Sequence, residues 1–334
     1  GADDGNKKSF IEHCKLNNIN CLIPKNQFRK ISVLDFFYFF ELIKIFKHHK
    51  FDIIHTNSTK PGLLGRIAAK ISRSSLVIHT VHGIAFYKSQ SLFKKIFFYF
   101  LEVFGTFFCD YIVLVNKYYS KYYRWIPFIK LKTIYNGLIF DNCPKIVLNN
   151  NNKLKRLLFL GRFEKQKDPM TLLMAINLIK NLNKNLYNKI EVKMFGEGNL
   201  ENDCKEFIIK NNLNISLSSW TKDKWSEFSK SDILCMPSLH EAFGLVFVEA
   251  GYCQIPIIST NVEGIPEVVV NGKSGLLCEP KNPRLLAKNI IKILEDSEYG
   301  KSLGKFGYEY VRNKFDFSSS LVEYQNLYQN LLIK

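Results

Sequence analysis

The amino-acid sequence predicts an α/β protein built from two doubly wound domains, each a parallel β-sheet with helices on both faces. The chain has 334 residues, and at about 100 to 200 residues per domain this length suggests two domains. From residue 50 onward, short β-rich runs alternate with amphipathic helical stretches, which is the pattern of a parallel sheet. Four asparagines at 149–152 interrupt the alternation, which then restarts, so we expect a linker there.

Each domain follows from its own run of elements. In the first half we expect strands at 51–56, 76–81, 111–115 and 132–135, with helices at 62–72, 92–108 and 117–125. In the second half we expect strands at 156–160, 190–195, 214–217, 233–236 and 255–259, with helices at 168–182, 200–211, 245–252, 283–296, 300–314 and 317–332. The predicted boundaries are an N-terminal domain at 1–147, a linker at 148–153, a C-terminal domain at 154–315 and a final helix at 316–334 that crosses back to the first domain. The default ligand site is the cleft between the domains.

Composition excludes several classes of protein. Apolar residues make up 46% of the chain and charged residues 23%, which is ordinary for a globular protein and too apolar for a disordered one. No run reaches the roughly 20 uncharged apolar residues that a membrane span requires. The eight cysteines are scattered, without a CxxC pair or a Cys/His cluster, so we expect buried thiols in a reducing cytoplasm and neither disulfides nor a metal site.

Charge is unevenly distributed along the chain. Residues 1–150 carry 22 basic against 9 acidic side chains, whereas residues 151–334 carry 25 against 21. A basic surface can serve anionic lipid, a phosphorylated ligand or nucleic acid, or it can simply be solvated. No nucleic-acid-binding motif accompanies it, so we expect no nucleic-acid partner.

The strongest local signal is the segment 237–266, PSLHEAFGLVFVEAGYCQIPIISTNVEGIP. A strand ends before Pro237, and a loop containing Glu241, Phe243 and Gly244 leads into a helix that begins near Leu245. The unpaired amides at a helix start favour an anion such as phosphate. Glu249 lies eight residues after Glu241, so two carboxylates can serve a ligand rich in hydroxyl groups. Taken alone, the same pattern also fits two ordinary helical glutamates.

Two further turns follow predicted strands. GRFEKQKDP at 161–169 begins with Gly161 and places Arg162 and Lys167 at the carboxyl end of a strand, where open α/β sheets bind ligands. Two cations there could clamp a diphosphate, although such a turn alone is more often a solvated loop. FGEG at 195–198, with Gly196 and Gly198, is a weak signal and is not a dinucleotide-binding fingerprint.

Together these residues resemble family 4 of the retaining nucleotide-sugar glycosyltransferases. The matching elements are GRFEKQK, FGEG, PSLHEAFGLVFVEA, EGIPEVV and NGKSGLL, in that order, over essentially the whole second half. In the first half, HTNSTKPGLLGRIAAK and HTVHGIAFY are similar to stretches of bacterial capsule, exopolysaccharide and O-antigen members. The resemblance implies the GT-B fold, in which two Rossmann-like domains face an interdomain cleft.

The resemblance also implies roles for individual residues. Arg162 and Lys167 match the pair on the donor diphosphate, and Glu241 matches the carboxylate that faces the hydroxyls of the transferred sugar. Glu249 matches the carboxylate that holds the ribose, and His82 matches the histidine that contacts the sugar near the reaction centre. The loop whose amides approach sugar and phosphate matches Phe243, Gly244 and Leu245, and the nucleotide-base pocket falls at Gly196 and Gly198.

The implied activity is transfer of a sugar, with retention, from a nucleotide-sugar, favoured to be a UDP-sugar, to a lipid-phosphate-linked or polysaccharide acceptor. By resemblance, the donor phosphate itself takes the acceptor's proton. The chain has no DxD pair, and we expect neither a metal nor another cofactor. Two alternatives stay open: a nucleotide-sugar-binding protein without catalytic activity, and, more remotely, a nucleotide-sugar epimerase.

The sequence departs from the family pattern in places. Ala242, Gln254 and Glu263 each stand where the family usually has glycine. Family members also begin with a strand, a glycine-rich loop, a helix and a second strand, and this chain opens after them. We therefore expect a fragment, or an allele without its beginning, and doubtful activity for this exact chain.

The aromatic segments of the first half have two interpretations. Residues 92–109 contain seven phenylalanines beside Lys94 and Lys95, and 36–46 is similarly aromatic. Either these helices pack on the sheet, or they present an interfacial face to the anionic cytoplasmic leaflet of the cell membrane, where a lipid-linked acceptor would be elongated.

Overall fold

The computed structural model describes residues 4–25, 32–74, 76–87, 90–144 and 154–333. The chain forms two compact units. Unit 1 comprises Gly1–Leu114, Lys121–Lys132 and Tyr328–Lys334, and unit 2 comprises Val115–Ser120 and Thr133–Leu327. The predicted linker at 148–153 lies outside the described residues.

Unit 1 contains a four-stranded sheet in the order β1-β2-β3-β4. Its strands are β1 (Ile53–Asn57), β2 (Leu76–Val81), β3 (Tyr111–Leu114) and β4 (Lys130–Thr133). The pairs β1–β2 and β2–β3 are parallel, with Ile53 opposite Leu76 and Ile78 opposite Tyr111. The central strands are rich in β-branched residues that are fully buried, as expected for a sheet covered on both faces.

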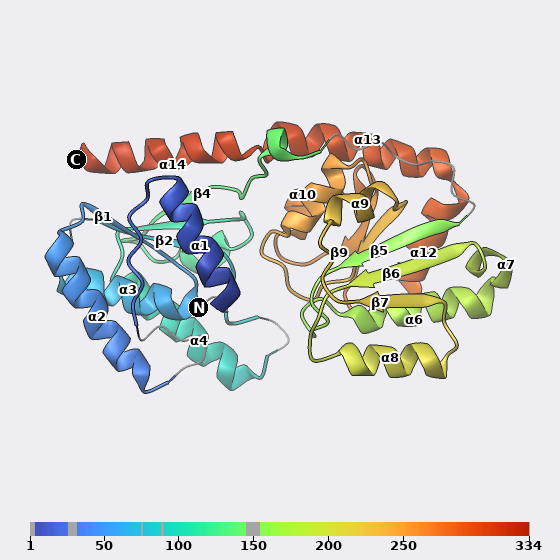
Figure 1. Cartoon of the computed structure of the whole chain (residues 1–334), viewed down its shortest axis with the longest axis horizontal. Helices are drawn as coiled ribbons and strands as arrows, with labels where there is room; N and C mark the ends of the chain where they lie inside the picture. Colours follow the sequence, from blue (N-terminus) through green and yellow to red (C-terminus); the bar gives the residue numbers. More distant parts are fainter. Residues whose placement is uncertain (1–3, 26–31, 75, 88–89, 145–153, 334) are drawn as a thin grey trace. The chain divides into compact units, whose positions relative to one another are not determined.

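The helices of unit 1 are α1 (Asp4–Leu16), α2 (Leu34–His49), α3 (Thr59–Ile71), α4 (Leu92–Thr106) and the short α5 (Ser120–Tyr123). Helices α2, α3 and α4 lie side by side below the strands of this unit in Figure 1, with α3 in the middle. Alanines 68 and 69 of α3 are fully buried, so this helix packs closely on the sheet.

Unit 2 contains a six-stranded parallel sheet in the order β10-β9-β8-β5-β6-β7. The strands are β5 (Lys155–Leu160), β6 (Ile190–Phe195), β7 (Ile215–Ser218), β8 (Ile233–Met236), β9 (Ile257–Thr260) and β10 (Gly275–Cys278). Every pair of neighbours is parallel. The strand order reverses between β5 and β8, because the chain proceeds from β5 toward one edge and from β8 toward the other.

Helices cover both faces of this sheet. The helices of unit 2 are α6 (Pro169–Leu182), α7 (Lys184–Tyr187), α8 (Glu201–Lys210), α9 (Lys224–Ser229), α10 (Leu245–Tyr252), α11 (Ile265–Val268), α12 (Pro283–Glu295), α13 (Ser297–Lys314) and α14 (Phe317–Leu332), of which α14 continues into unit 1 from Tyr328. Figure 1 shows α6 and α8 on one face and α10 and α13 on the other. Helix α6 starts at Pro169, and the Asp168 carboxylate caps it by accepting from the Thr171 amide.

The predicted α/β class with two parallel-sheet domains is confirmed. Several elements differ from those expected, and the helices α1, α2, α7, α9 and α11 were not among the predicted ones. The helix expected at 117–125 is reduced to α5; before it, the amides of Lys117 and Tyr118 donate to the Glu267 carboxylate and that of Tyr119 donates to the Asn116 side chain. The strand expected at 132–135 begins two residues earlier, and β10 was not predicted.

No helix in the described part of the chain combines the length and the apolarity that crossing a bilayer requires.

Candidate functional site

The residues predicted to bind the donor converge on the carboxyl edge of the unit 2 sheet. Strand β5 lies between β8 and β6, so the loops that follow these three strands lie next to one another. The loops contain residues 161–168 after β5, 196–198 after β6 and 237–244 after β8. The strand order reverses between β5 and β8, and open α/β sheets bind ligands outside the strand ends at such a reversal.

Three predicted glycines bring two of these turns into backbone contact. A Cβ atom on Gly196 would lie 2.0 Å from the Gly161 carbonyl oxygen, and one on Gly198 would lie 2.4 Å from the carbonyl oxygen of Phe163. The Phe163 amide also donates to the Glu197 carbonyl at 3.0 Å. Glycine at 196 and 198 is therefore required for the turns to approach this closely.

A glutamine ties the turn that carries Arg162 to the loop that carries Glu241. The Arg162 guanidinium donates to the Gln166 side-chain oxygen at 2.9 Å, and the Gln166 amide nitrogen donates to the His240 carbonyl at 3.0 Å. The Leu239 amide in turn donates to the Gln166 carbonyl at 2.8 Å. These bonds hold the exposed Arg162 beside the loop after β8.

Lys167 and Glu241 meet directly in an ion pair between Nζ and Oε2. Their side chains are 14% and 12% exposed, so the pair is largely shielded but still reachable by a ligand. The structure thus brings together a cation and a carboxylate that are 74 residues apart in the sequence.

The loop ends at the start of α10. Gly244 has a φ of +79°, and a Cβ atom there would lie 2.5 Å from the Phe247 ring and 3.1 Å from Cγ of Glu241. The Phe243 ring is buried against Phe315, with the centroids 5.1 Å apart, so only its backbone can face a ligand. Leu245 begins the helix and is 42% exposed. The first amides of α10 therefore lie beside Glu241, where their partial positive charge favours an anion.

Glu249 lies just over one turn into α10, and its side chain is nearly buried. Its Oε1 accepts from Nζ of Lys224 in α9 at 2.6 Å. Burial raises the pKa of the Glu249 carboxyl, and Lys224 opposes this shift by stabilising the carboxylate. A carboxylate held in this way can accept from ligand hydroxyl groups.

Glu263 is a residue of this site that sequence reasoning noted only as a departure from the glycine of the family pattern. Its Oε2 accepts from the Glu241 amide and from the Tyr119 hydroxyl, both at 3.1 Å, and its Oε1 lies 3.3 Å from Nδ1 of His240. The Glu263 carboxylate therefore fixes the backbone that carries Glu241. The only signal in the sequence was a glutamate at a position where the family usually has glycine. That signal did not show which groups the carboxylate would contact.

His82 belongs to unit 1 and is described with that unit. It follows β2, and its Nε2 lies 3.0 Å from the side-chain oxygen of Asn57, which ends β1. An amide oxygen can only accept, so Nε2 carries the proton and Nδ1 is the acceptor in the neutral ring. Partial burial lowers the pKa of His82, which favours this neutral form.

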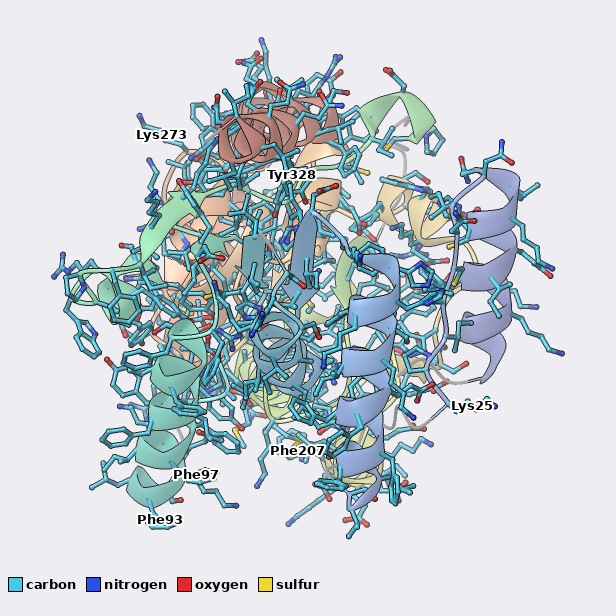
Figure 2. The ribbon with its side chains drawn as sticks, turned by 90° about the vertical axis from the view of Figure 1, so that its left-hand side faces the viewer. Lys25, Phe93, Phe97, Phe207, Lys273 and Tyr328 are labelled. Carbon is cyan, nitrogen blue, oxygen red and sulfur yellow. The ribbon has the colours of Figure 1, made fainter. Side chains whose placement is uncertain are left out.

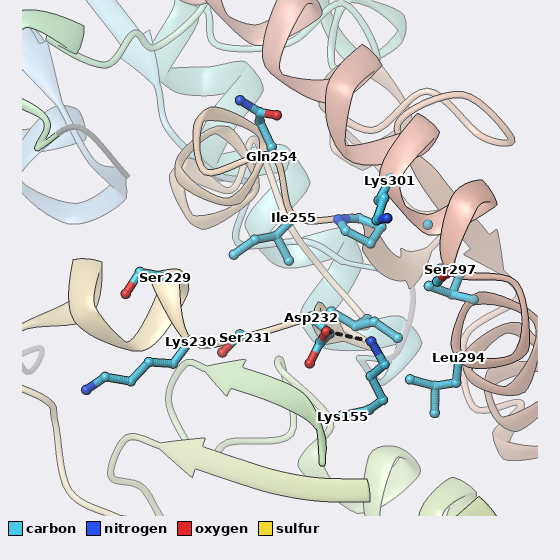
Figure 3. A pocket seen from close by; sticks show the side chains of 14 residues that line it. Lys155, Ser229, Lys230, Ser231, Asp232, Gln254, Ile255, Leu294, Ser297 and Lys301 are labelled. Atoms are coloured by element: carbon cyan, nitrogen blue, oxygen red, sulfur yellow. Dashed lines mark hydrogen bonds and ion pairs between the residues drawn. The ribbon is translucent and has the colours of Figure 1, made fainter. Parts of the chain in front are cut away.

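A pocket at the opposite edge of the unit 2 sheet is unrelated to these residues. It lies at the amino ends of the strands, between Lys155, Asp232 and Ile255 on the sheet side and Leu294 and Lys301 on the helices (Figure 3). Lys155 and Asp232 form an ion pair of 3.3 Å there. None of the residues predicted to bind the donor lines this pocket.

Among the described residues, no three His, Cys, Asp or Glu side chains gather closely enough to hold a metal ion.

Comparison with known proteins agrees with this fold. Residues 6–141 match the model of glycosyltransferase family 4, and residues 145–310 match that of group 1 glycosyl transferases. An uncharacterised glycosyltransferase of Methanocaldococcus jannaschii is 30% identical over 84% of this chain and 76% of its own length. An Escherichia coli UDP-Gal:α-D-GlcNAc-diphosphoundecaprenol α-1,3-galactosyltransferase is 28% identical over 80% of this chain and 73% of its own.

Among solved structures, Anabaena HepE in complex with UDP and glucose superimposes with a TM-score of 0.79 at 17% identity, covering 96% of this chain and 89% of that one. That likeness shows the fold. The two family models and the M. jannaschii relative together place this chain among the family 4-type glycosyltransferases of the GT-B fold.

Proposed function

We propose that the chain transfers a sugar, with retention of configuration, from a UDP-sugar to a lipid-linked glycan acceptor in bacterial surface-glycan synthesis. The observation that carries this proposal is the cluster at the carboxyl edge of the unit 2 sheet. It combines Arg162, Lys167 and the first amides of α10 with two carboxylates, Glu241 and Glu249. Cations and helix amides suit a diphosphate, and the carboxylates suit the hydroxyl groups of the sugar and the ribose.

The proposed chemistry follows from where charge develops. When the bond between the sugar and the diphosphate breaks, the sugar becomes oxocarbenium-like and negative charge builds on the departing phosphate. Arg162, Lys167 and the start of α10 offer positive charge to that phosphate. In the same-face mechanism that we propose for retention, the leaving phosphate oxygen takes the proton of the acceptor hydroxyl. No metal is assigned to this step.

His82 has a separate proposed role. Its Nε2 is engaged by Asn57, so Nδ1 is the nitrogen available to a ligand. A neutral imidazole in that tautomer can accept from a sugar hydroxyl but cannot donate a charge-assisted bond. We therefore assign His82 to orientation of the transferred sugar.

The choice of donor and acceptor rests on related proteins. The E. coli relative is named for UDP-galactose and a diphosphoundecaprenol-linked acceptor, and HepE was solved with UDP and glucose. Other relatives are named for capsular polysaccharide and O-antigen biosynthesis. We propose the same classes of donor and acceptor here, and a working position on the inner face of the cell membrane.

Nucleotide binding tests the donor half of the proposal. Calorimetric titration of the chain with UDP, GDP and ADP should show binding of UDP alone, and Lys167→Met should weaken it. The matched control is Lys165→Met in the same turn, because Lys165 is exposed and should leave UDP affinity unchanged. Equal binding of all three nucleotides, or equal effects of the two substitutions, would contradict the proposed donor site.

Turnover tests the catalytic half. With UDP-sugars and an undecaprenyl-diphosphate-linked acceptor, Arg162→Ala should reduce the rate by about 100-fold or more, since one electrostatic contact to a transition state is worth about that much. Binding of UDP without transfer to any such acceptor would instead favour a nucleotide-sugar-binding protein without catalytic activity.

A further inference from the structure

Helix α4 is oriented with its apolar side outward. Its buried residues are Glu102, Gly105 and Thr106. Its exposed apolar residues, which we call the aromatic face, are Leu92, Phe93, Ile96, Phe97, Phe100 and Phe104, and Phe93 is 81% exposed. The four phenylalanines recur at spacings of three and four residues, so they form one continuous stripe along the helix. Figure 2 shows Phe93 and Phe97 projecting from the free end of α4.

None of these phenylalanines is among the buried residues of α4. Helix α4 is attached to α3 through Glu102, whose carboxylate accepts from the Arg66 guanidinium at 3.2 Å, with the Arg66 side chain wholly buried. Gly105 allows this contact, because a Cβ atom there would lie 2.5 Å from Nη2 of Arg66. The fully buried positions of the helix are therefore Glu102, Gly105 and Thr106, and the aromatic face is exposed to water. A contiguous apolar surface of this kind marks an interaction site.

The charges beside the aromatic face are positive. Within residues 92–114 and 121–132 of unit 1 there are six basic and two acidic side chains. Both acidic groups are paired internally, Glu102 with Arg66 and Asp110 with Lys70 at 2.6 Å. Lys94 is exposed on the flank of the aromatic face, and Lys95 follows it in the first turn of α4 and is partly exposed. The partner must therefore accept aromatic side chains and carry negative charge.

Neighbouring aromatic residues extend the face beyond α4. Phe107 and Phe128 are both exposed, and their rings lie 4.9 Å apart. Trp125 is 54% exposed, and its indole N–H donates to the Tyr99 hydroxyl at 2.8 Å. Trp and Tyr favour the boundary between the headgroups and the acyl chains of a bilayer, where an amphipathic ring has one apolar and one polar neighbour.

We propose that the aromatic face, with Lys94, Lys95 and Trp125, inserts into the headgroup region of an anionic lipid bilayer. Phenylalanines would enter the acyl boundary while the lysines contact lipid phosphates, as in other interfacial helices. This surface is the partner-binding element of the function proposed above, since it would hold the chain where a lipid-linked acceptor lies. A second copy of the chain fits less well, because a symmetric contact would bring the two Lys94/Lys95 pairs together.

Vesicle co-sedimentation tests the proposal. The full chain should bind vesicles of equal parts phosphatidylglycerol and phosphatidylcholine, and bind phosphatidylcholine alone much more weakly. Lys94→Glu with Lys95→Glu should weaken binding to the anionic vesicles by at least about 25-fold, at about fivefold per lysine lost. Phe93→Ser with Phe97→Ser should weaken it by at least about 100-fold, at about tenfold per ring. Bilayer binding should also shift the Trp125 fluorescence to the blue, and Trp125→Phe should abolish most of this shift.

The control makes one change of each kind on unit 2. Ile209→Ser with Lys210→Glu alters an exposed apolar residue and an exposed lysine of α8, and it should leave vesicle binding unchanged. UDP affinity of every variant should equal that of the parent chain. Unaltered vesicle binding by Phe93→Ser with Phe97→Ser would overturn the docking surface and leave the proposed donor site untouched. The proposal would also be overturned if the parent chain bound no vesicles but formed a concentration-dependent dimer that Phe93→Ser with Phe97→Ser abolished. That result would assign the aromatic face to self-association.

Discussion

Replacing Glu241 by Gln should separate nucleotide binding from transfer. In the ligand-free chain, Lys167 is paired with Glu241, so the cation proposed for the donor diphosphate already has a partner. A bound diphosphate must compete with the Glu241 carboxylate for Lys167. Gln has the same size and keeps hydrogen-bonding capacity, but it removes the competing charge. UDP contains the diphosphate and lacks the sugar that Glu241 is proposed to face, so UDP affinity should rise while turnover of the UDP-sugar falls.

The magnitude follows from the shielding of the pair. Ion pairs on an open surface are worth about 0–1 kcal/mol, whereas two charges 4 Å apart at an effective dielectric constant near 20 interact by about 4 kcal/mol. The Lys167 and Glu241 side chains are 14% and 12% exposed, so this pair lies between these limits. Release of about 1–2 kcal/mol corresponds to UDP binding that is about 5- to 30-fold tighter. Turnover should fall by about 100-fold or more, because one stabilising contact to the reacting sugar is lost.

Calorimetry with UDP and a steady-state transfer assay measure the two effects. Lys167→Met should bind UDP more weakly than the parent, and the double variant Lys167→Met with Glu241→Gln should bind like Lys167→Met alone, because the gain acts through Lys167. If Glu241→Gln weakens UDP binding, or if the double variant retains the gain, the competition between carboxylate and diphosphate is refuted.

Three further predictions concern the scaffold of the two units. Gly244→Ala should cost about 2 kcal/mol of unfolding free energy and weaken UDP binding, because its φ of +79° and the Phe247 ring 2.5 Å away leave no room for a Cβ atom; urea titration of both proteins measures the cost. Burial lowers the pKa of His55 to about 4 from an ordinary 6.5, so between these pH values the unfolded chain binds more protons than the folded chain. Unit 1 should therefore lose about 1.4 kcal/mol of unfolding free energy for each unit by which the pH falls in this range. Urea titrations at pH 7 and pH 5 measure this loss, and His55→Gln should reduce it. Arg66→Met should destabilise unit 1 by about 3–5 kcal/mol by leaving Glu102 buried without its partner, and Arg66→Met with Glu102→Met should recover most of that loss; full additivity of the two losses in thermal unfolding would contradict it.

The residues that follow strands β5 and β8 could be predicted from the sequence, because the strand, turn and helix patterns around them are local. Strand, turn and helix signals around 156–169 and 233–252 fixed which residues follow β5 and β8. The rule that parallel strands present their carboxyl ends at one edge then places Arg162, Lys167 and Glu241 near one another. The close packing of the turns at Gly161 and Gly196 follows from the same topology. No knowledge of individual side-chain contacts was needed for this conclusion.

The partners of these residues could not be predicted in the same way. Glu249 pairs with Lys224, which precedes it by 25 residues and belongs to another helix. Glu263 reaches the Glu241 amide from a loop on the next strand, and the sequence shows only that a glycine is missing there. Such contacts depend on the directions in which side chains of neighbouring loops point. The periodicity of residues within one helix or strand gives no information about these directions.

For helix α4, too, the sequence alone could not predict the contacts, and here the contacts decide which function is proposed. Its spacing of phenylalanines predicts an apolar stripe, but a stripe can face the sheet or the solvent. The residues that decide between these are Arg66 and Glu102, which are 36 residues apart and form a buried ion pair on the opposite side of the helix. Desolvating two charges is costly, so such a pair requires the two charged groups to approach closely, and here Gly105 provides the space for the guanidinium. The contact between Glu102 and Arg66 consequently orients the apolar stripe toward solvent. Packing inside unit 1 alone therefore does not explain why the stripe is rich in phenylalanine.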